Sequence, residues 1–163
     1  MSLDRLVAAA SYREAAMRQM MHVFKYSRMR ECSEGLAACL FPCLRFLSPV
    51  PTPLLCPVPL HWMRRMFRGF NQSADLAAIL AKEKEWQVCS LLRRVRPGLA
   101  QVGLSNSLRR KNVEGIFRCR EVSPPYVLLI DDVATTGATL DACARVLKDA
   151  GARRVEGLVV ALG

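Results

Sequence analysis

The stretch Val127-Leu-Leu-Ile-Asp-Asp-Val-Ala-Thr-Thr-Gly-Ala-Thr139 joins four aliphatic residues to two carboxylates and then to a loop of small and hydroxyl side chains. Four apolar residues in a row are typical of a strand covered on both faces, as in a parallel sheet with helices on either side. After Thr139, apolar residues recur at helical spacing until Gly151, which is expected to end a helix. The stretch therefore predicts a strand over 126–130, a turn and a helix. In open α/β sheets such turns lie at the carboxyl ends of the strands, where ligands bind.

The turn itself has the composition of a phosphate site. Gly137 lets the backbone approach a ligand closely, and the N–H groups from Thr136 to Thr139 would lie at a helix N-terminus. Free N–H groups and the positive end of the helix dipole both favour an anion there. The threonine hydroxyls add donors, so we expect a phosphate to be held by Ala134, Thr135, Thr136, Gly137, Ala138 and Thr139.

Asp131 and Asp132 require a different ligand group, because two carboxylates beside a phosphate would repel it. They can accept hydrogen bonds from a vicinal diol, or hold a hydrated divalent cation that offsets the negative charge. A diol next to a phosphate is the arrangement found in ribose 5-phosphate. The alternative is that these acidic residues only cap the helix that follows.

Residues 130–139 resemble the binding motif for phosphoribosyl pyrophosphate (PRPP) in the type I phosphoribosyltransferases. Within that superfamily, the chain resembles the ComF family of competence-associated proteins over about residues 12–162. Further matching blocks are Cys56-Pro-Val-Pro-Leu-His61, Arg68-Gly-Phe-Asn-Gln72 and Gln101-Val-Gly-Leu-Ser105. The resemblance implies an α/β, type I phosphoribosyltransferase-like fold: a mostly parallel central sheet flanked by helices, with a small hood and a mobile loop.

By this resemblance, Asp131 and Asp132 would hold the ribose diol of PRPP and contact Mg²⁺ indirectly, through PRPP. Cleavage of the bond from ribose to pyrophosphate builds positive charge on the ring, and the two carboxylates would stabilise that charge in catalysis. Relatives that salvage 6-oxopurines have an aspartate where this chain has Thr135. A threonine cannot act as a base at neutral pH, which argues against a hypoxanthine–guanine enzyme and leaves the acceptor open.

A second candidate segment follows the strand expected over 54–58. Its prolines restrict the backbone, and its arginines suit a diphosphate because one guanidinium can bind two oxygens at once. The alternatives are a basic helix face for the arginines and a structural, hydrogen-bonded role for the lone histidine. In the type I phosphoribosyltransferases the corresponding loop binds pyrophosphate, which implies that role for Pro59, Leu60, His61 and Arg64, with Arg68 as a catalytic residue.

Residues 97–112 have no clean period and predict a long loop, a length that compact domains usually reserve for function. The loop contains Arg109, Arg110 and Lys111, and it resembles the mobile loop that closes over the site in this superfamily. Closure would exclude water and bring Lys111, a further candidate catalytic residue, to the leaving pyrophosphate. A surface loop with solvated charge fits the same composition.

Two functions fit these residues. The first is transfer of the phosphoribosyl group from PRPP to an unknown acceptor with release of pyrophosphate, the reaction of a glycosyltransferase. The second is a non-catalytic PRPP- or nucleotide-binding module that acts in competence and the uptake of single-stranded DNA. A P-loop ATPase is disfavoured, because no Gly-x-x-x-x-Gly-Lys-Ser/Thr sequence occurs.

The composition limits the remaining properties. A chain of 163 residues predicts one domain, with a helical part over about 1–50 and an α/β core over 54–163. The net charge of +10 favours phosphorylated substrates or nucleic acid as partners, although a solvated basic surface has the same composition. No apolar run reaches membrane length and no signal peptide is recognised, so a cytoplasmic location without membrane insertion is expected. The oligomeric state is left open, with a homodimer as one option.

The seven cysteines include no Cys-x-x-Cys pair. Cys32, Cys39 and Cys43 would share one face of a helix over about 31–46, where a buried apolar role is commoner than metal binding. Unpaired thiols suit a reducing cytoplasm. ComF relatives usually carry a zinc ribbon with Cys-x-x-Cys pairs before the position of Tyr12. Since this sequence has no such pairs, no zinc is expected in the chain.

The other elements follow from periodicity and turn signals. Asn71 or Ser73 would cap a helix that runs on through Leu80. An earlier helix over 12–26 would bury Met17, Met20, Met21 and Phe24. Further strands are expected over 54–58, 88–95, 113–119 and 155–162, and the last of them would close the sheet.

Overall fold

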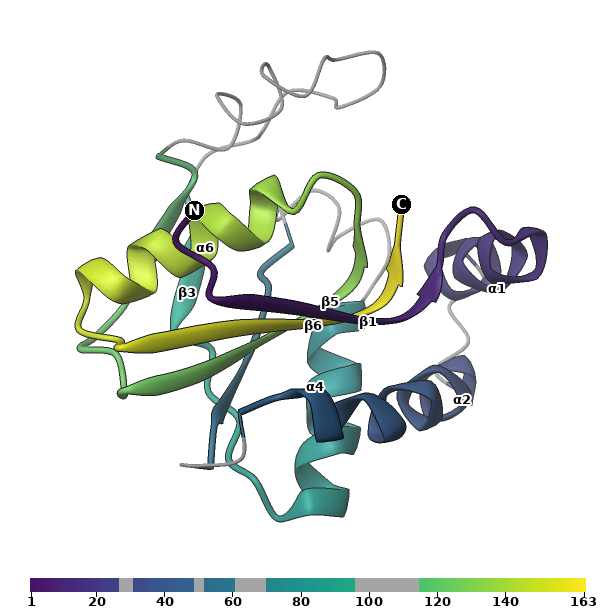
Figure 1. The fold of residues 1–163 in the computed structure, drawn as a ribbon, viewed down its shortest axis with the longest axis horizontal. Coiled ribbons are helices and arrows are strands. Elements are labelled where there is room, and N and C mark those ends of the chain that lie inside the picture. Colours follow the sequence, from purple (N-terminus) through teal and green to yellow (C-terminus); the bar gives the residue numbers. More distant parts are fainter. Residues whose placement is uncertain (27–30, 49–51, 61–69, 96–114) are drawn as a thin grey trace.

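The computed structural model describes residues 1–26, 31–48, 52–60, 70–95 and 115–163, which form an α/β fold (Figure 1). The strands are β1 (Arg5–Ser11), β2 (Leu54–Pro57), β3 (Leu92–Arg94), β4 (Phe117–Cys119), β5 (Tyr126–Ala134) and β6 (Arg154–Leu162). The helices are α1 (Ala15–Tyr26), α2 (Glu31–Leu40), the 3-10 helix η1 (Phe41–Phe46), α4 (Gln72–Lys84) and α6 (Ala138–Asp149). Within these ranges, no helix is both long enough and apolar enough to cross a membrane.

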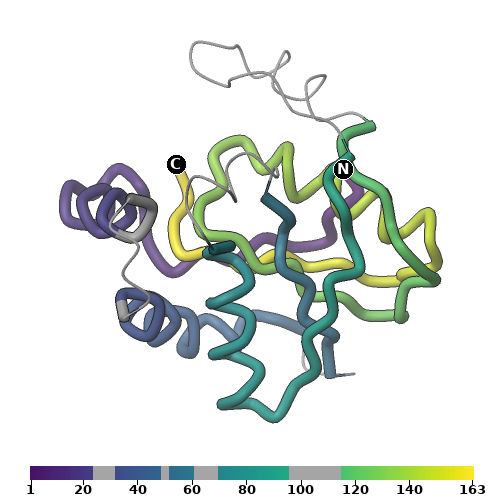
Figure 2. Tube along the Cα trace, turned by 180° about the vertical axis from the view of Figure 1, so that it is seen from behind, coloured from purple at the N-terminus to yellow at the C-terminus, as the bar shows by residue number. Residues whose placement is uncertain are grey.

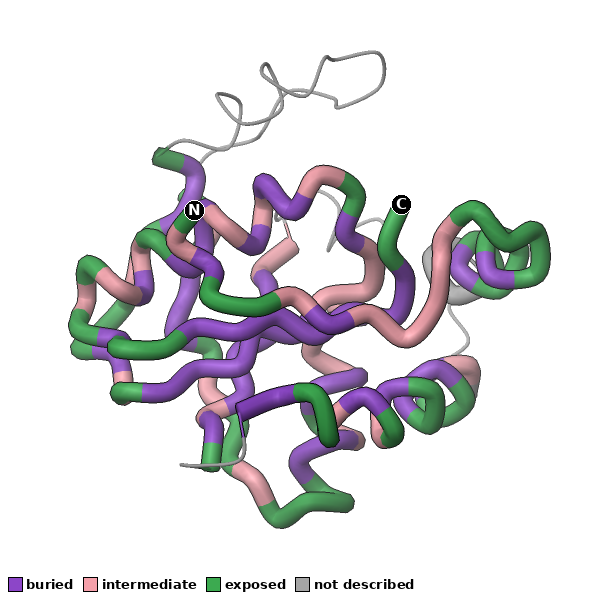
Figure 3. Tube along the Cα trace, viewed as in Figure 1, coloured by how far each residue is buried: buried purple, intermediate pink, exposed green. Residues whose placement is uncertain are grey.

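Four strands form a parallel sheet in the order β1-β6-β5-β2. The aliphatic residues Val127–Ile130 of β5 are completely buried, and Figure 3 shows both central strands, β5 and β6, buried along most of their length. Strands that are buried on both faces need apolar side chains at every position rather than at alternate ones. The predicted parallel sheet with helices on both sides is therefore confirmed.

Strand β1 corrects two expectations from the sequence. Residues 1–50 are not only helical, and β6 does not close the sheet. Instead, β1 pairs in parallel with β6, from Arg5 opposite Glu156 to Ser11 opposite Leu162, and occupies the edge. Its alanine-rich sequence has little intrinsic preference for a strand, so the pairing with β6 decides its conformation.

One face of the sheet packs against α4 and α2, and α1 lies next to α2 (Figures 1 and 2). Leu128 and Ile130 of β5 point into this layer. The buried side chains that they meet come from α1, α2 and α4 and include Met21, Leu36, Leu40, Leu76 and Leu80. This layer contains the helices α1, α2 and α4.

The opposite face of the sheet packs against α6 and a small second sheet. Val127 and Leu129 of β5 point into this layer. Strands are expected over 88–95 and 113–119, but the structure has the shorter β3 and β4, which pair antiparallel with each other and not with the parallel sheet. Val88 makes only an isolated parallel bridge with Leu55.

Helix α1 begins at Ala15, three residues after the predicted start. Met17 and Met21 are buried, as expected. Met20 is 43% exposed, so its assignment to the core is wrong, and it lines an open groove between α1 and α2 instead. The side chain of Phe24 lies outside the described residues.

The single helix predicted over 31–46 is two elements, α2 and η1. The break coincides with Pro42, which has no N–H to donate to the preceding turn of an α-helix. The shared buried face of the three cysteines is therefore also wrong. Cys43 is buried, Cys32 is half-buried and Cys39 is exposed.

Candidate functional site

Strands β2 and β5 are neighbours, but the helices that follow them cover opposite faces of the sheet. Helix α4 follows β2 and packs on the face of Leu128 and Ile130, whereas α6 follows β5 and packs on the face of Val127 and Leu129. In an open α/β sheet such a reversal leaves a crevice outside the carboxyl ends of the two strands, and ligands bind there. The candidate site therefore lies where β2 and β5 end.

The two carboxylates lie within β5 and not in the turn after it. The strand was expected to end at Ile130, but it continues to Ala134 because it stays paired with β6, with Asp131 opposite Val159 and Ala134 opposite Leu162. Strand β2 has already ended at Pro57, opposite Ile130. Asp131 and Asp132 thus lie where β5 has lost its neighbour on one side, and both are half-buried.

Donors from nearby residues orient both carboxylates. Asp131 Oδ1 accepts hydrogen bonds from Ser73 Oγ and from the N–H of Asp132, each at 2.9 Å. Asp132 Oδ1 accepts a hydrogen bond from the N–H of Val133 at 2.7 Å. A carboxylate that is held in this way presents its oxygens in a fixed direction, which favours binding of a polyol or a hydrated cation.

The predicted phosphate turn contains a glycine in a left-handed conformation. Gly137 has φ 70° and ψ 2°, in the left-handed region, and it is the N-cap residue of α6 without a side-chain cap. Thr136 Oγ1 accepts a hydrogen bond from the N–H of Ala138 at 3.4 Å. Around this helix N-terminus, Thr135 is exposed and Thr139 is half-buried. The first N–H groups of a helix have no carbonyl partner within the helix, and such groups can bind an anion.

A side chain at Gly137 would have space within the protein. A Cβ there would lie 3.8 Å from Met1 Cε and 3.9 Å from Leu6 Cδ2, which are ordinary contacts. Glycine is therefore required for the positive φ and not because neighbouring atoms crowd the position.

The segment after β2 lies beside Asp131. The N–H of Val58 donates to Ile130 O at 3.0 Å, and Asn71 Nδ2 donates to Val58 O at 3.2 Å. Pro59 and Leu60 follow directly and are half-buried. Two strand exits therefore meet, as the sequence predicts. The remaining candidates lie outside the described residues: His61, Arg64, Arg68 and Lys111.

Of the two predicted capping residues, Asn71 takes the N-cap position of α4 and Ser73 does not. Asn71 is the N-cap residue of α4, but its side chain makes no capping hydrogen bond. Its amide reaches Val58, and Ser73, inside the first turn, donates to Asp131. Both side chains therefore tie the start of α4 to the site. Ser73 is a site residue that sequence reasoning missed, because hydroxyl-to-carboxylate contacts across 58 positions leave no local signal.

Tyr12 is a second residue that was missed. Its N–H donates to Leu162 O at 2.7 Å, and the N–H of Gly163 donates to Ala134 O at 2.9 Å. A Cβ on Gly163 would lie 3.3 Å from Tyr12 Cβ and 3.7 Å from Thr135 Cγ2. An aromatic residue thus lies beside the exposed threonine at the edge of the candidate site.

The carboxylates fit the way in which proteins hold Mg²⁺ together with a phosphorylated substrate. That ion keeps several waters and needs only one or two carboxylates in addition to substrate phosphates. Asn71 Oδ1 is a buried acceptor at the same edge that finds no donor within the described ranges. In that part of the chain, no group of three or more His, Cys, Asp or Glu side chains could hold a metal without such help.

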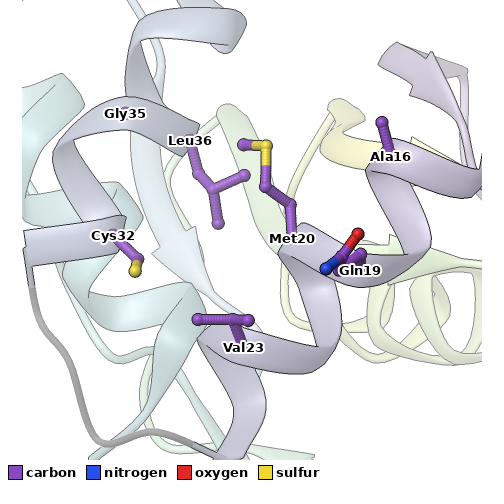
Figure 4. Close-up of a pocket in the computed structure, with 7 residues that line it drawn as sticks. All are labelled: Ala16, Gln19, Met20, Val23, Cys32, Gly35 and Leu36. Atoms are coloured by element: carbon purple, nitrogen blue, oxygen red, sulfur yellow. The ribbon is translucent and has the colours of Figure 1, made fainter.

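A groove between α1 and α2 is chemically different from this site (Figure 4). It encloses about 450 Å³, and its lining includes Met20 and Val23 of α1 and Leu36 of α2. None of the described residues that line it is a lysine, arginine, aspartate or glutamate. The described lining of the groove is therefore unlike that of a site for a phosphorylated ligand.

Comparison with known proteins identifies clear relatives. The DNA utilization protein YhgH of Salmonella typhi is 34% identical over 162 residues, which are 94% of this chain and 70% of that protein. The protein of the same name from Escherichia coli O157:H7 is 35% identical over 164 residues, with the same coverage of both chains. Competence protein F of Haemophilus influenzae is 28% identical over 165 residues, 95% of this chain and 71% of that protein. No family model matches the chain.

Proposed function

This chain belongs to the ComF family, and from that premise we propose that it binds PRPP where β2 and β5 end, as a type I phosphoribosyltransferase-like protein. The observation that carries the proposal is the left-handed Gly137 directly before α6, at the carboxyl end of a buried parallel strand. Such a turn can present N–H groups that have no carbonyl partner within the helix to an anion. The 5-phosphate of PRPP would bind to residues 134–139.

Asp131 and Asp132 would bind the ribose diol. They lie three and two positions before Ala134, the first residue of the phosphate turn, and a diol and a phosphate are likewise neighbours in ribose 5-phosphate. The hydrogen bond from Ser73 would keep Asp131 pointing at the diol. Mg²⁺, when bound, would supply positive charge to the pyrophosphate and would be held mostly by PRPP and water.

The pyrophosphate would extend towards the segment after β2. Pro59 and Leu60 lie at that edge, and His61, Arg64, Arg68 and Lys111 are proposed partners by family resemblance. As the bond from ribose to pyrophosphate breaks, positive charge develops on the ribose. The carboxylates of Asp131 and Asp132 would stabilise that charge, and the arginines would bind the departing group bidentately.

A second candidate function is a role in the handling of DNA, with or without phosphoribosyl transfer. It is supported by the names of the relatives, a DNA utilization protein and a competence protein, and by the net charge of +10. A site that binds PRPP does not require an acceptor pocket. If the protein does transfer a phosphoribosyl group, Thr135 disfavours a 6-oxopurine as the acceptor, because a threonine cannot act as a base.

Calorimetry with PRPP and Mg²⁺ tests the site. The double variant Asp131→Asn/Asp132→Asn should bind PRPP at least several-fold more weakly, because the diol and the cation lose charged partners. Asp149→Asn, which removes an exposed carboxylate at the opposite end of α6, should bind normally. Equal affinities in the wild type and the double variant would refute the proposed site. Measurement of pyrophosphate release across nucleobases and amines would then separate a transferase from a binding module.

A further inference from the structure

The small sheet of β3 and β4 carries an unusual pair of residues. Its antiparallel register places Arg93 directly opposite Arg118, and both side chains are exposed. Arg120 follows two positions after Arg118, where side chains of a strand return to the same face, and it is exposed as well. Arg93, Arg118 and Arg120 are called the arginine face below.

Like charges directly opposite each other destabilise a strand pair. The ion pairs found in the described residues are Arg5–Glu156 and Lys148–Asp4, and neither involves the arginine face. The acid nearest in sequence is Glu121, and its carboxylate accepts a hydrogen bond from Cys89 Sγ at 3.6 Å. The repulsion within the arginine face would be relieved by an anionic partner from outside the described part of the protein.

The strands that carry the arginine face are packed against the core and held by backbone hydrogen bonds. Leu92 and Phe117, on the other side of the two strands, are buried in the core beside α6. The N–H of Arg120 donates to Leu91 O at 2.8 Å, and the N–H of Val95 donates to Ile116 O at 2.7 Å, so pairing extends beyond both ends of the ladder. The backbone positions of the arginines are therefore held before any partner binds, which lowers the entropy cost of binding.

We propose that the arginine face binds the sugar–phosphate backbone of a nucleic-acid strand. Guanidinium groups bind phosphate oxygens bidentately, and their arrangement along a strand, with a repeat of about 6.8 Å, suits a polymer with regularly spaced charges. Among the described residues of β3 and β4, the one aromatic side chain is Phe117, which is buried on the other side of the strands, so stacking on bases does not contribute. Binding is therefore independent of base sequence. The inference rests on the proposed role with DNA and gives that role a surface.

Charge variants with opposite effects on stability and binding test the proposal. Arg93→Glu creates an opposite-charge pair with Arg118, so its melting temperature should be equal to or higher than that of the wild type. Its affinity for nucleic acid should nevertheless fall. Arg93→Glu/Arg118→Glu should weaken binding about tenfold or more, and should reduce the slope of log K against log salt by about 1.4, or 0.7 per lost phosphate contact.

The matched control is Arg13→Glu/Arg18→Glu, which changes the formal charge by the same amount on exposed residues at the start of α1. Figure 1 shows α1 at the opposite end of the molecule from β3. Binding is measured by fluorescence anisotropy of a labelled homothymidine oligonucleotide over a range of salt concentrations. A mixed-sequence duplex distinguishes a single strand from a double strand, and polyglutamate serves as an acidic-protein competitor.

We expect the arginine-face variants to lose affinity for oligonucleotide while the control keeps it. The proposal is overturned if the control weakens binding as much, because net charge then explains the effect. It is also overturned if polyglutamate binds with the same dependence on Arg93 and Arg118. If the wild type binds oligonucleotide and the arginine-face variants bind it equally well, the arginine face is not the binding surface, but the role with DNA stands. If the wild type binds neither the single strand nor the duplex, the role with DNA is refuted as well. The proposed PRPP site is tested independently by calorimetry with PRPP.

Discussion

The central strands β5 and β6 both carry acidic side chains, but Glu156 of β6 is buried, whereas Asp131 and Asp132 of β5 are partly exposed. Glu156, near the amino end of β6, is 2% exposed and accepts hydrogen bonds from Tyr126 Oη at 2.6 Å and from Ser48 Oγ at 2.7 Å. Arg5 Nε lies 3.8 Å away. Asp131 and Asp132, near the carboxyl end of β5, are half-buried, and among the described residues their donors include adjacent backbone N–H groups and one serine.

This difference separates a structural charge from a candidate functional one. Glu156 links β1, the chain after η1 and β5 through its partners Arg5, Ser48 and Tyr126. Burial and the hydrogen bond to Glu156 raise the pKa of Tyr126, so the phenol stays a donor. The carboxylates of β5 lie at the end of the sheet where α/β proteins bind ligands. Stability and ligand binding should therefore respond to different substitutions.

The largest effect is expected for Glu156→Ala. Removal of the carboxylate leaves the buried Tyr126 hydroxyl and Ser48 without their acceptor, which should lower the free energy of unfolding by about 3 kcal/mol. Urea denaturation measures this change. PRPP affinity of the folded variant should equal that of the wild type, and a large loss of affinity would contradict the separation of the two centres.

A smaller effect on stability and a large one on binding are expected for Gly137→Ala. The positive φ of Gly137 costs a residue with a side chain about 1–2 kcal/mol, although the protein leaves space for the methyl group. Any relaxation of this φ moves the N–H groups of the phosphate turn, so PRPP affinity should fall about tenfold or more.

Thr139→Ala is the matched comparison within the same turn. It removes one hydroxyl and leaves the backbone N–H groups, so it should weaken binding by only about 1 kcal/mol. Calorimetry with PRPP on both variants shows which substitution weakens binding more. If Thr139→Ala is the more damaging, side-chain hydroxyls hold the phosphate and the backbone argument is wrong.

The smallest effect is a difference in pH dependence. Burial raises the pKa of Glu156, but hydrogen bonds from Tyr126 and Ser48 and the charge of Arg5 together lower it by more. The pKa of Glu156 therefore lies below its ordinary value. A depressed folded pKa contributes stability above the unfolded value of about 4.3, and that stability is lost as the pH falls through the folded pKa. Unfolding measured from neutral pH to about pH 3 should therefore show a shallower acid loss in Glu156→Gln than in the wild type.

Local sequence was enough to predict the centre of the fold and the backbone of the site. The run Val127–Ile130 is typical of a strand covered on both faces, and the glycine of the turn precedes a helix with a regular apolar face. Both features depend on residues within one strand–turn–helix unit. The prediction of a strand, a glycine-containing turn and a helix therefore did not need the rest of the chain.

Only the tertiary structure decided which segments meet. An alanine-rich β1 becomes a strand because β6 pairs with it, and β5 extends past Ile130 for the same reason. Register placed Arg93 opposite Arg118, and packing at the start of α4 brought Ser73 to Asp131. Pairing and register depend on contacts between residues far apart in the chain, and these contacts override weak local preferences without leaving a periodic signal in the sequence.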